Sequence, residues 1–181
     1  MFRTRVVATG PELIREGVRS LEGVLREAID SARSEIQILA YTVTPSALPL
    51  LQRLRQAVRR GVRVTLVLNN PDELDGTVRD FLSQLQGEQP DRVRVLGFGE
   101  PDRALHAKVV VVDRSRALVG SANLTGGGMV RNYEVGILVE GEPASMIARM
   151  VDRVAMLASG YACRKSSSRS PRISPTPEAA S

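Results

Sequence analysis

Apolar and polar positions along the chain follow two periods, one helical and one extended. Apolar residues recur every three or four positions over residues 11–32, after Pro11, and this predicts one amphipathic helix. These positions are Leu13, Ile14, Val18, Leu21, Leu25, Ala28, Ile29 and Ala32. Residues 35–43 alternate instead, with Ile36, Ile38 and Ala40 on one face, which predicts a strand.

Helical and extended patterns continue to alternate as far as residue 158. Residues 46–61 predict a second helix ended by Gly61, and residues 62–70 predict a β-branched strand. The later segments predict a helix at 78–85, strands at 92–96, 107–113, 117–121 and 133–140, and a helix at 143–158. Such alternation predicts an α/β fold, a layered sheet with helices on both faces.

Length and composition indicate one domain over residues 1–159. Cys163 is the only cysteine of the 181 residues, so an internal disulfide is excluded, and no histidine–cysteine cluster suggests a metal site. We therefore expect neither a metal nor a cofactor. No apolar run has the length of a signal peptide or a membrane span. We expect a cytoplasmic protein without stable membrane insertion.

The net charge of +5 is concentrated near the C-terminus. Residues 160–181 carry four cations against one glutamate, and they are rich in serine and proline with few large apolar side chains. Such a segment cannot bury enough surface to offset its ordering entropy, so we expect a disordered tail. An electrostatic tether for nucleic acid is the alternative interpretation.

Residues 105–125 carry the candidate chemistry. His106 is the only histidine, and Lys108 is one of two lysines in a chain with 23 arginines. Because the chain uses arginine for general positive charge, the compact ammonium of Lys108 indicates a specific role at this position. The two residues are two positions apart and share a face near the start of a strand. Ser121 and Asn123 share a parity beyond the tight turn, after Gly120. Together these groups predict a phosphate pocket.

The spacing of six residues resembles the signature of the phospholipase D superfamily of phosphodiesterases. They are His106, Lys108, Asp113, Gly120, Ser121 and Asn123. The resemblance extends over residues 11–158, leaving only the tail outside it. It implies a phospholipase D-like fold, in which a mixed β-sheet is sandwiched between helices.

The resemblance also implies a mechanism of two displacements at phosphorus. His106 would attack to give a phosphohistidine, while a second histidine protonates the leaving oxygen and then activates water. Lys108 and Asn123 would hold the nonbridging oxygens, and Ser121 would add a hydroxyl donor. Glu134 matches the family's acidic residue, which hydrogen-bonds the other ring nitrogen of the histidine.

The chain holds a single copy of a motif that the family chemistry needs twice, and no second histidine. The missing half must come from another chain. The chain resembles the short single-motif members of the family, and this resemblance implies a two-fold dimer with a shared active site. We therefore expect a homodimer here.

Three features allow two interpretations each. Asp113 is either coupled to the histidine or a strand-end residue that caps a turn. Residues 126–128, three glycines, form either a phosphate cradle or a flexible loop. An arginine cluster is either a solvated face or a backbone-binding patch, and it comprises Arg53, Arg55, Arg59, Arg60 and Arg63.

The substrate is the least determined part of the prediction. Compact single-motif members resemble sequence-nonspecific nucleases, and no interfacial apolar helix is evident, so DNA or RNA hydrolysis is favoured. A phospholipid or other small phosphodiester is the second candidate. The third is a catalytically silent nucleic-acid-binding module of a larger defence or DNA-processing complex.

Overall fold

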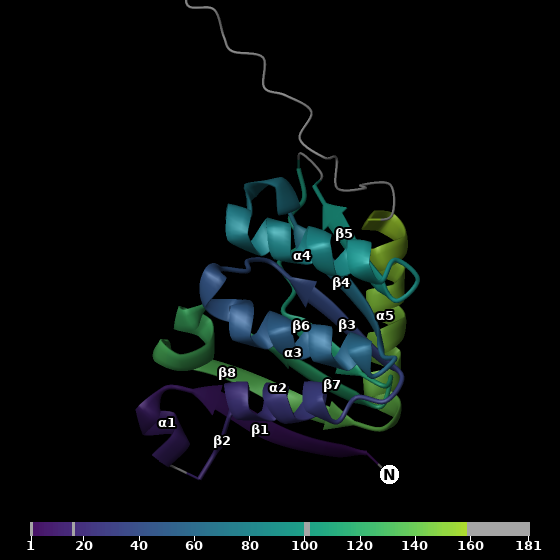
Figure 1. Cartoon of the computed structure of the whole chain (residues 1–181). Coiled ribbons are helices and arrows are strands. Elements are labelled where there is room, and N and C mark those ends of the chain that lie inside the picture. Colours follow the sequence, from purple (N-terminus) through teal and green to yellow (C-terminus); the bar gives the residue numbers. More distant parts are fainter. Residues whose placement is uncertain (1, 16, 100–101, 159–181) are drawn as a thin grey trace, which may run out of the picture.

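A single mixed sheet of eight strands forms the centre of the computed structural model, which describes residues 2–15, 17–99 and 102–158 (Figure 1). The strand order is β2-β1-β8-β7-β6-β3-β4-β5. The bounds are β1 (Arg3–Thr9), β2 (Arg19–Ser20), β3 (Glu35–Ala40), β4 (Arg63–Asn69), β5 (Val93–Phe98), β6 (Val109–Val112), β7 (Arg116–Gly120) and β8 (Glu134–Glu140). β1 and β2 are parallel, as are β3, β4 and β5, whereas the other neighbours are antiparallel. The predicted tail lies outside the described residues.

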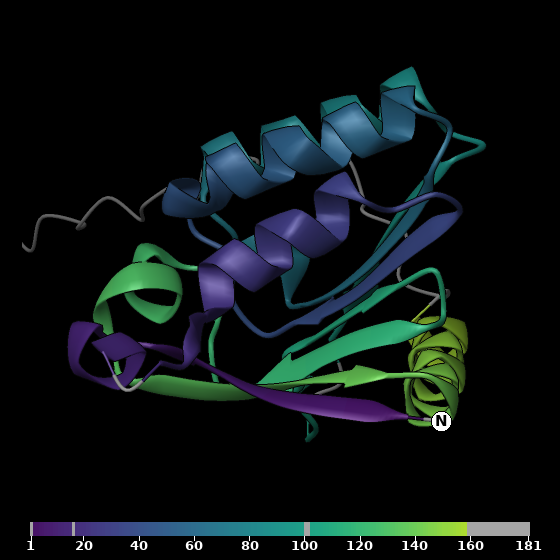
Figure 2. The same cartoon turned by 90° about the horizontal axis from the view of Figure 1, so that it is seen from below.

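Helices cover the two faces of the sheet unequally, as Figure 2 shows. Helices α2, α3 and α4 pack on one face, and α5 is the only helix of the described residues on the other. The helices are α1 (Pro11–Arg15), α2 (Leu21–Asp30), α3 (Leu48–Arg59), α4 (Gly76–Glu88) and α5 (Glu142–Ala158), with short turns η1 (Pro45–Ala47), η2 (Pro71–Glu73) and η3 (Gly127–Arg131). The prediction of a mixed sheet between helical layers is confirmed.

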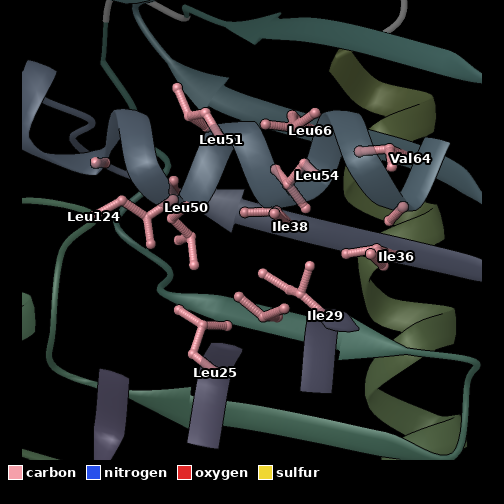
Figure 3. Packing of buried hydrophobic residues seen from close by; sticks show 14 of the residues in the cluster. Leu25, Ile29, Ile36, Ile38, Leu50, Leu51, Leu54, Val64, Leu66 and Leu124 are labelled. Carbon is pink, nitrogen blue, oxygen red and sulfur yellow. The ribbon is translucent and has the colours of Figure 1, made fainter. Parts of the chain in front are cut away.

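The larger core lies between the sheet and helices α2 to α4 (Figure 3). Leu51 and Leu54 of α3 and Ile36 and Ile38 of β3 are fully buried members of this core. Gly61, with φ +97°, ends the chain's turn after α3 and lets β4 return parallel to β3. The predicted β-α-β unit is therefore present.

The single helix predicted over residues 11–32 is wrong. Gly17 adopts φ +81°, a left-handed conformation that ends helices, and the chain then forms the short strand β2. The Ser20 hydroxyl accepts a hydrogen bond from the Gly23 amide at 3.1 Å and so starts α2 as a new helix.

A tight hairpin joins β6 to β7 at the end of the sheet where α5 is anchored. Asp113 and Arg114 have φ of +52° and +55°, as expected of a hairpin turn whose twist matches the strands. The Ser145 hydroxyl of α5 donates to the Arg114 carbonyl at 2.8 Å, and Asp152 of α5 pairs with the Arg114 guanidinium at 2.7 Å. The single helix on this face is thus fixed near the hairpin turn.

Part of the sheet face beside α5 is not covered by the described residues. Val6 of β1 pairs with Ile137 of β8, and Val135 is two residues before Ile137, so all three side chains share one face. Their exposed fractions are 56%, 42% and 54% for Val6, Ile137 and Val135 respectively. We call these three residues the open apolar patch.

Candidate active site

Strand ends bring the candidate residues to one edge of the sheet. His106 and Lys108 precede β6, Ser121 follows β7, and Glu134 is the first residue of β8. Cross-strand bonds align these ends, because the Gly120 amide donates to the Lys108 carbonyl at 3.2 Å and the Ser121 amide donates to the Val135 carbonyl at 3.1 Å. The segment with His106 and Lys108 therefore lies beside the segment with Ser121, as expected, and the start of β8 lies next to both.

His106 and Lys108 are in direct contact. The Lys108 ammonium lies 3.2 Å from both ring nitrogens of the exposed His106 and 2.8 Å from the His106 carbonyl oxygen. The ammonium is thus within hydrogen-bonding distance of the ring nitrogens, and the tautomer of the imidazole determines which of them can accept. A side chain that can act as a nucleophile and a cation that can stabilise an oxyanion therefore lie side by side.

Two opposite effects act on the pKa of Lys108. Burial lowers the pKa of Lys108, and the negative charge of Glu134 offsets only part of that effect, so the net direction is downward. Glu134 is thus close enough to act on the ammonium through its charge.

Glu134 bonds to Ser121 and not to His106. The Ser121 hydroxyl donates to one carboxylate oxygen, and the Asn132 side-chain amide donates to the other at 3.2 Å. Within the described part of the chain, the His106 ring contacts Lys108 and Tyr41 instead. The hydrogen bond that the family resemblance implied between Glu134 and His106 is therefore not made within this single chain.

The Asn123 backbone is closely approached by Gly128. A Cβ on the buried Gly128 would lie 2.5 Å from the Asn123 carbonyl oxygen and 2.9 Å from its amide nitrogen, so only glycine fits. The Oδ1 of Asn123 is buried, and the described residues offer it no hydrogen-bond partner. An unsatisfied acceptor of this kind is costly and is typical of functional positions.

The glycine loop is bonded to the protein rather than left open for a phosphate. The Gly126 amide donates to the Ser46 hydroxyl at 2.6 Å, and the Gly128 amide donates to the Thr125 hydroxyl at 2.9 Å. Two of the three amides thus have partners. This favours a supporting role for the loop beneath Asn123 over a phosphate cradle.

Asp113 lies away from the other candidate residues. Its carboxylate accepts hydrogen bonds from the backbone amides of Arg33, Ser34 and Glu35 at 2.7–3.2 Å, at the start of β3. His106 contacts Tyr41, which follows the last residue of β3. A strand of that length separates the two ends by about 20 Å. The structure therefore places Asp113 as an anchor of the hairpin turn.

The arginine cluster is largely occupied by contacts within the chain. Arg53 pairs with Asp30 at 2.5 Å and Arg63 with Glu35 at 3.3 Å. Arg60 donates to backbone carbonyls of α2, and Arg55 lies over the Phe81 ring at 4.4 Å. These contacts favour a structural and solvated role for the cluster over a nucleic-acid patch.

Tyr41 is a member of the site that the sequence did not reveal. Its ring centroid is 4.6 Å from that of His106, at an interplanar angle of 58°, and the Lys108 ammonium is 5.0 Å from the Tyr41 centroid. The one available signal was an aromatic residue directly after an apolar strand, in a chain with only 3% aromatic residues. No group of three His, Cys, Asp or Glu among the described residues is placed to hold a metal ion.

Comparison with known proteins identifies the family and the fold. Residues 25–154 match the family described as cardiolipin synthase, PLD-like domain. The DISARM protein DrmC of Bacillus paralicheniformis is 30% identical over 148 residues, which make up 80% of this chain and 60% of DrmC. Cardiolipin synthase A of Pseudomonas aeruginosa is 36% identical over 138 residues, which make up 76% of this chain and 27% of that protein. The chain thus spans less than two thirds of either relative.

A solved structure shows the same fold. NucT from Helicobacter pylori superposes with a TM-score of 0.67, covering 87% of this chain and 98% of NucT. At 17% sequence identity, this likeness concerns the arrangement of strands and helices.

Proposed function

The chain belongs to the phospholipase D-like family of phosphodiesterases, and from this premise we propose that it hydrolyses phosphodiester bonds of DNA or RNA without a metal ion. One observation carries the proposal. The exposed His106 imidazole lies 3.2 Å from the Lys108 ammonium, so a nucleophile and an oxyanion stabiliser share one edge of the sheet.

The proposed reaction has two steps that balance. A ring nitrogen of His106 bonds to phosphorus, the P–O bond to the leaving group breaks, and the leaving oxygen takes a proton from a second imidazole. Water then attacks the phosphohistidine, gives a proton to that second imidazole, and releases His106. Lys108 and Asn123 stabilise the charge on the nonbridging oxygens. Ser121 orients Glu134, whose negative charge keeps Lys108 protonated more readily.

The second imidazole comes from another copy of the chain in this proposal, because the sequence holds one histidine. A two-fold axis would bring both His106 residues to one site. We place the open apolar patch in the contact between the two copies, since Val135 is adjacent to Glu134 in β8, although the patch lies on the α5 face and the Glu134 side chain points to the opposite face. Clustered exposed apolar side chains of this kind mark contact surfaces.

Two other candidate functions each have an observation in their favour. Similarity to cardiolipin synthase A favours a phospholipid substrate. Similarity to the DISARM protein DrmC supports the defence context of the other candidate, a catalytically silent nucleic-acid-binding module of a defence or DNA-processing complex. None of the described helices is long and apolar enough to cross a bilayer.

A comparison of substrates tests the proposal. Plasmid, single-stranded DNA, RNA and cardiolipin vesicles would be incubated with the wild type and with His106→Ala, each with and without excess EDTA. We expect nucleic-acid cleavage by the wild type alone, with EDTA having no effect. Cleavage restricted to cardiolipin, loss of cleavage on chelation, or binding without cleavage would each contradict it.

Mixing of chains tests the shared site. Wild-type and His106→Ala chains in equal amounts would be unfolded together and refolded, so that they pair at random. Fully competent pairs would then be about a quarter of all dimers. Independent sites would retain about half of the activity, and that result would contradict the composite site.

A further inference from the structure

Tyr41 lies where the two reactive side chains meet. Its ring contacts the His106 imidazole, with centroids 4.6 Å apart, and faces the Lys108 ammonium at 5.0 Å. The ammonium thus lies next to both rings, since it is also 3.2 Å from both nitrogens of His106. An aromatic face attracts a cation, and an adjacent ring limits the rotation of a neighbouring imidazole.

The backbone beside Tyr41 is fixed to the segment that carries Asn123. The Leu124 amide donates to the Thr42 carbonyl at 3.2 Å, and the Thr44 amide donates to the Leu124 carbonyl at 3.1 Å. Val43 and Leu124, which form a parallel bridge, are both buried. The backbone that follows Tyr41 is therefore held rigidly against the Asn123 segment, and the Tyr41 ring lies against His106.

The imidazole needs such a support within the single chain. Both carboxylate oxygens of Glu134 are used by Ser121 and Asn132, and the described contacts of the His106 ring are with Lys108 and Tyr41. An exposed histidine without a carboxylate partner would otherwise sample several rotamers and lose attack geometry.

From these contacts we infer that Tyr41 is the positioning residue of the active site: its ring fixes the His106 imidazole and the Lys108 ammonium as one unit. The inference rests on the proposed role of His106 as the nucleophile. Because the ring makes both contacts, the ring is needed and the hydroxyl is not; no hydrogen bond joins the hydroxyl to the described residues. Phenylalanine at position 41 should therefore preserve this positioning role, whereas an aliphatic residue should not.

The single histidine allows a direct test, because the proton NMR spectrum contains one set of imidazole signals. The wild type, Tyr41→Phe and Tyr41→Leu would be compared without substrate, with melting temperatures as a check of folding. The shift that the Tyr41 ring current imposes on these signals should persist in Tyr41→Phe and disappear in Tyr41→Leu. Tyr41→Met serves as a second non-aromatic variant should Tyr41→Leu melt early.

Kinetics on a phosphodiester oligonucleotide supply the second readout. Tyr41→Leu should lose roughly tenfold in kcat, the size of a partly desolvated cation–π contact, with KM changed less, while Tyr41→Phe stays within about twofold of the wild type. Tyr133→Leu is the matched control: Tyr133 is 66% exposed, next to Glu134, and bonds to Glu12 at 2.8 Å. It should leave both the imidazole signals and kcat close to the wild type.

The outcomes separate this inference from the proposed function. Unchanged imidazole signals in a folded Tyr41→Leu, or a kcat loss equal to that of Tyr133→Leu, would overturn the role of Tyr41. A wild type without phosphodiesterase activity would contradict the proposed function, and the NMR comparison would still decide whether Tyr41 holds the imidazole.

Discussion

Replacing Ile137 by aspartate should separate the proposed dimer into single chains. Ile137 lies in the open apolar patch, between Val6 across the strand pair and Val135 two residues before it. In the proposed assembly a second copy covers this patch, so the substitution places a carboxylate in each half of a two-fold contact.

The exposed fractions give the size of the effect. Complete burial of a valine or isoleucine side chain is worth about 1.5–3 kcal/mol, and these three side chains are roughly half exposed, so about 1 kcal/mol remains to be gained by each. A two-fold contact contains six of them, hence about 6 kcal/mol. Ile137→Asp forfeits about 2 kcal/mol of this and desolvates two carboxylates at several kcal/mol. A loss of at least about 4 kcal/mol weakens association roughly a thousandfold.

Light scattering and hydrolysis at the same protein concentration measure the outcome. We expect the wild type to be a dimer and Ile137→Asp to be a single chain. Ile137→Asp should melt as a folded single chain but have little activity. Ile14→Asp is the matched control, because Ile14 is 40% exposed against 42% for Ile137 and lies on α1. A dimeric and active Ile137→Asp would refute the reasoning, as would equal dissociation of both variants.

Further predictions concern the site and its supports. His106→Ala and Lys108→Ala should each lower kcat by about a thousandfold or more with little change in melting temperature, since the proposed mechanism uses both side chains and neither belongs to the buried core; steady-state kinetics and thermal melting check this. Gly128→Ala should lower kcat and melting temperature together, because its Cβ would lie 2.5 Å from the Asn123 carbonyl oxygen. Asp113→Asn should destabilise the fold by about 1 kcal/mol at neutral pH without changing kcat per folded chain. Burial raises the pKa of Asp113, but hydrogen bonds from Ser34, Glu35 and Arg33 outweigh burial, so the net pKa is lowered from 3.8. The stability that the Asp113 carboxylate contributes is therefore present above that pH and is lost as the pH falls through the lowered pKa. Urea unfolding from pH 7 to about pH 3 should show that the difference in unfolding free energy between the wild type and Asp113→Asn becomes smaller.

Most of the sheet and its helices could be predicted because their patterns reflect burial. The segment around β6 is apolar at successive positions, and Val110, Val111 and Val112 are buried in the centre of the sheet. The break after α1 was not predicted, because the apolar spacing continues through Gly17, and only its positive φ and the cap at Ser20 interrupt the helix. β1 was missed as well, since its first four residues are exposed and show no apolar alternation.

The site could be predicted as far as linear spacing determines which strand ends meet. His106, Lys108 and Ser121 lie together because the hairpin register is set by the intervening strands. Tyr41 could not be found in this way, since its contact depends on the pairing of β3 with β6, two elements far apart in the sequence. The partners of Glu134 depend likewise on side-chain geometry, which spacing does not encode.

A site divided between two chains makes turnover depend on protein concentration. In the proposed mechanism one chain supplies a nucleophile and an oxyanion stabiliser, but protonation of the leaving oxygen requires a second imidazole that the sequence does not contain. Below the dissociation constant of the dimer, the fraction of paired chains rises with total concentration, and activity per chain should rise in proportion. Serial dilution with a sensitive fluorescent oligonucleotide measures this, and Ile137→Asp should show the same dependence displaced to higher concentration. Constant activity per chain at dilutions where scattering detects only single chains would mean that one copy completes both displacements, in which case the proton donor must be a group other than a second histidine.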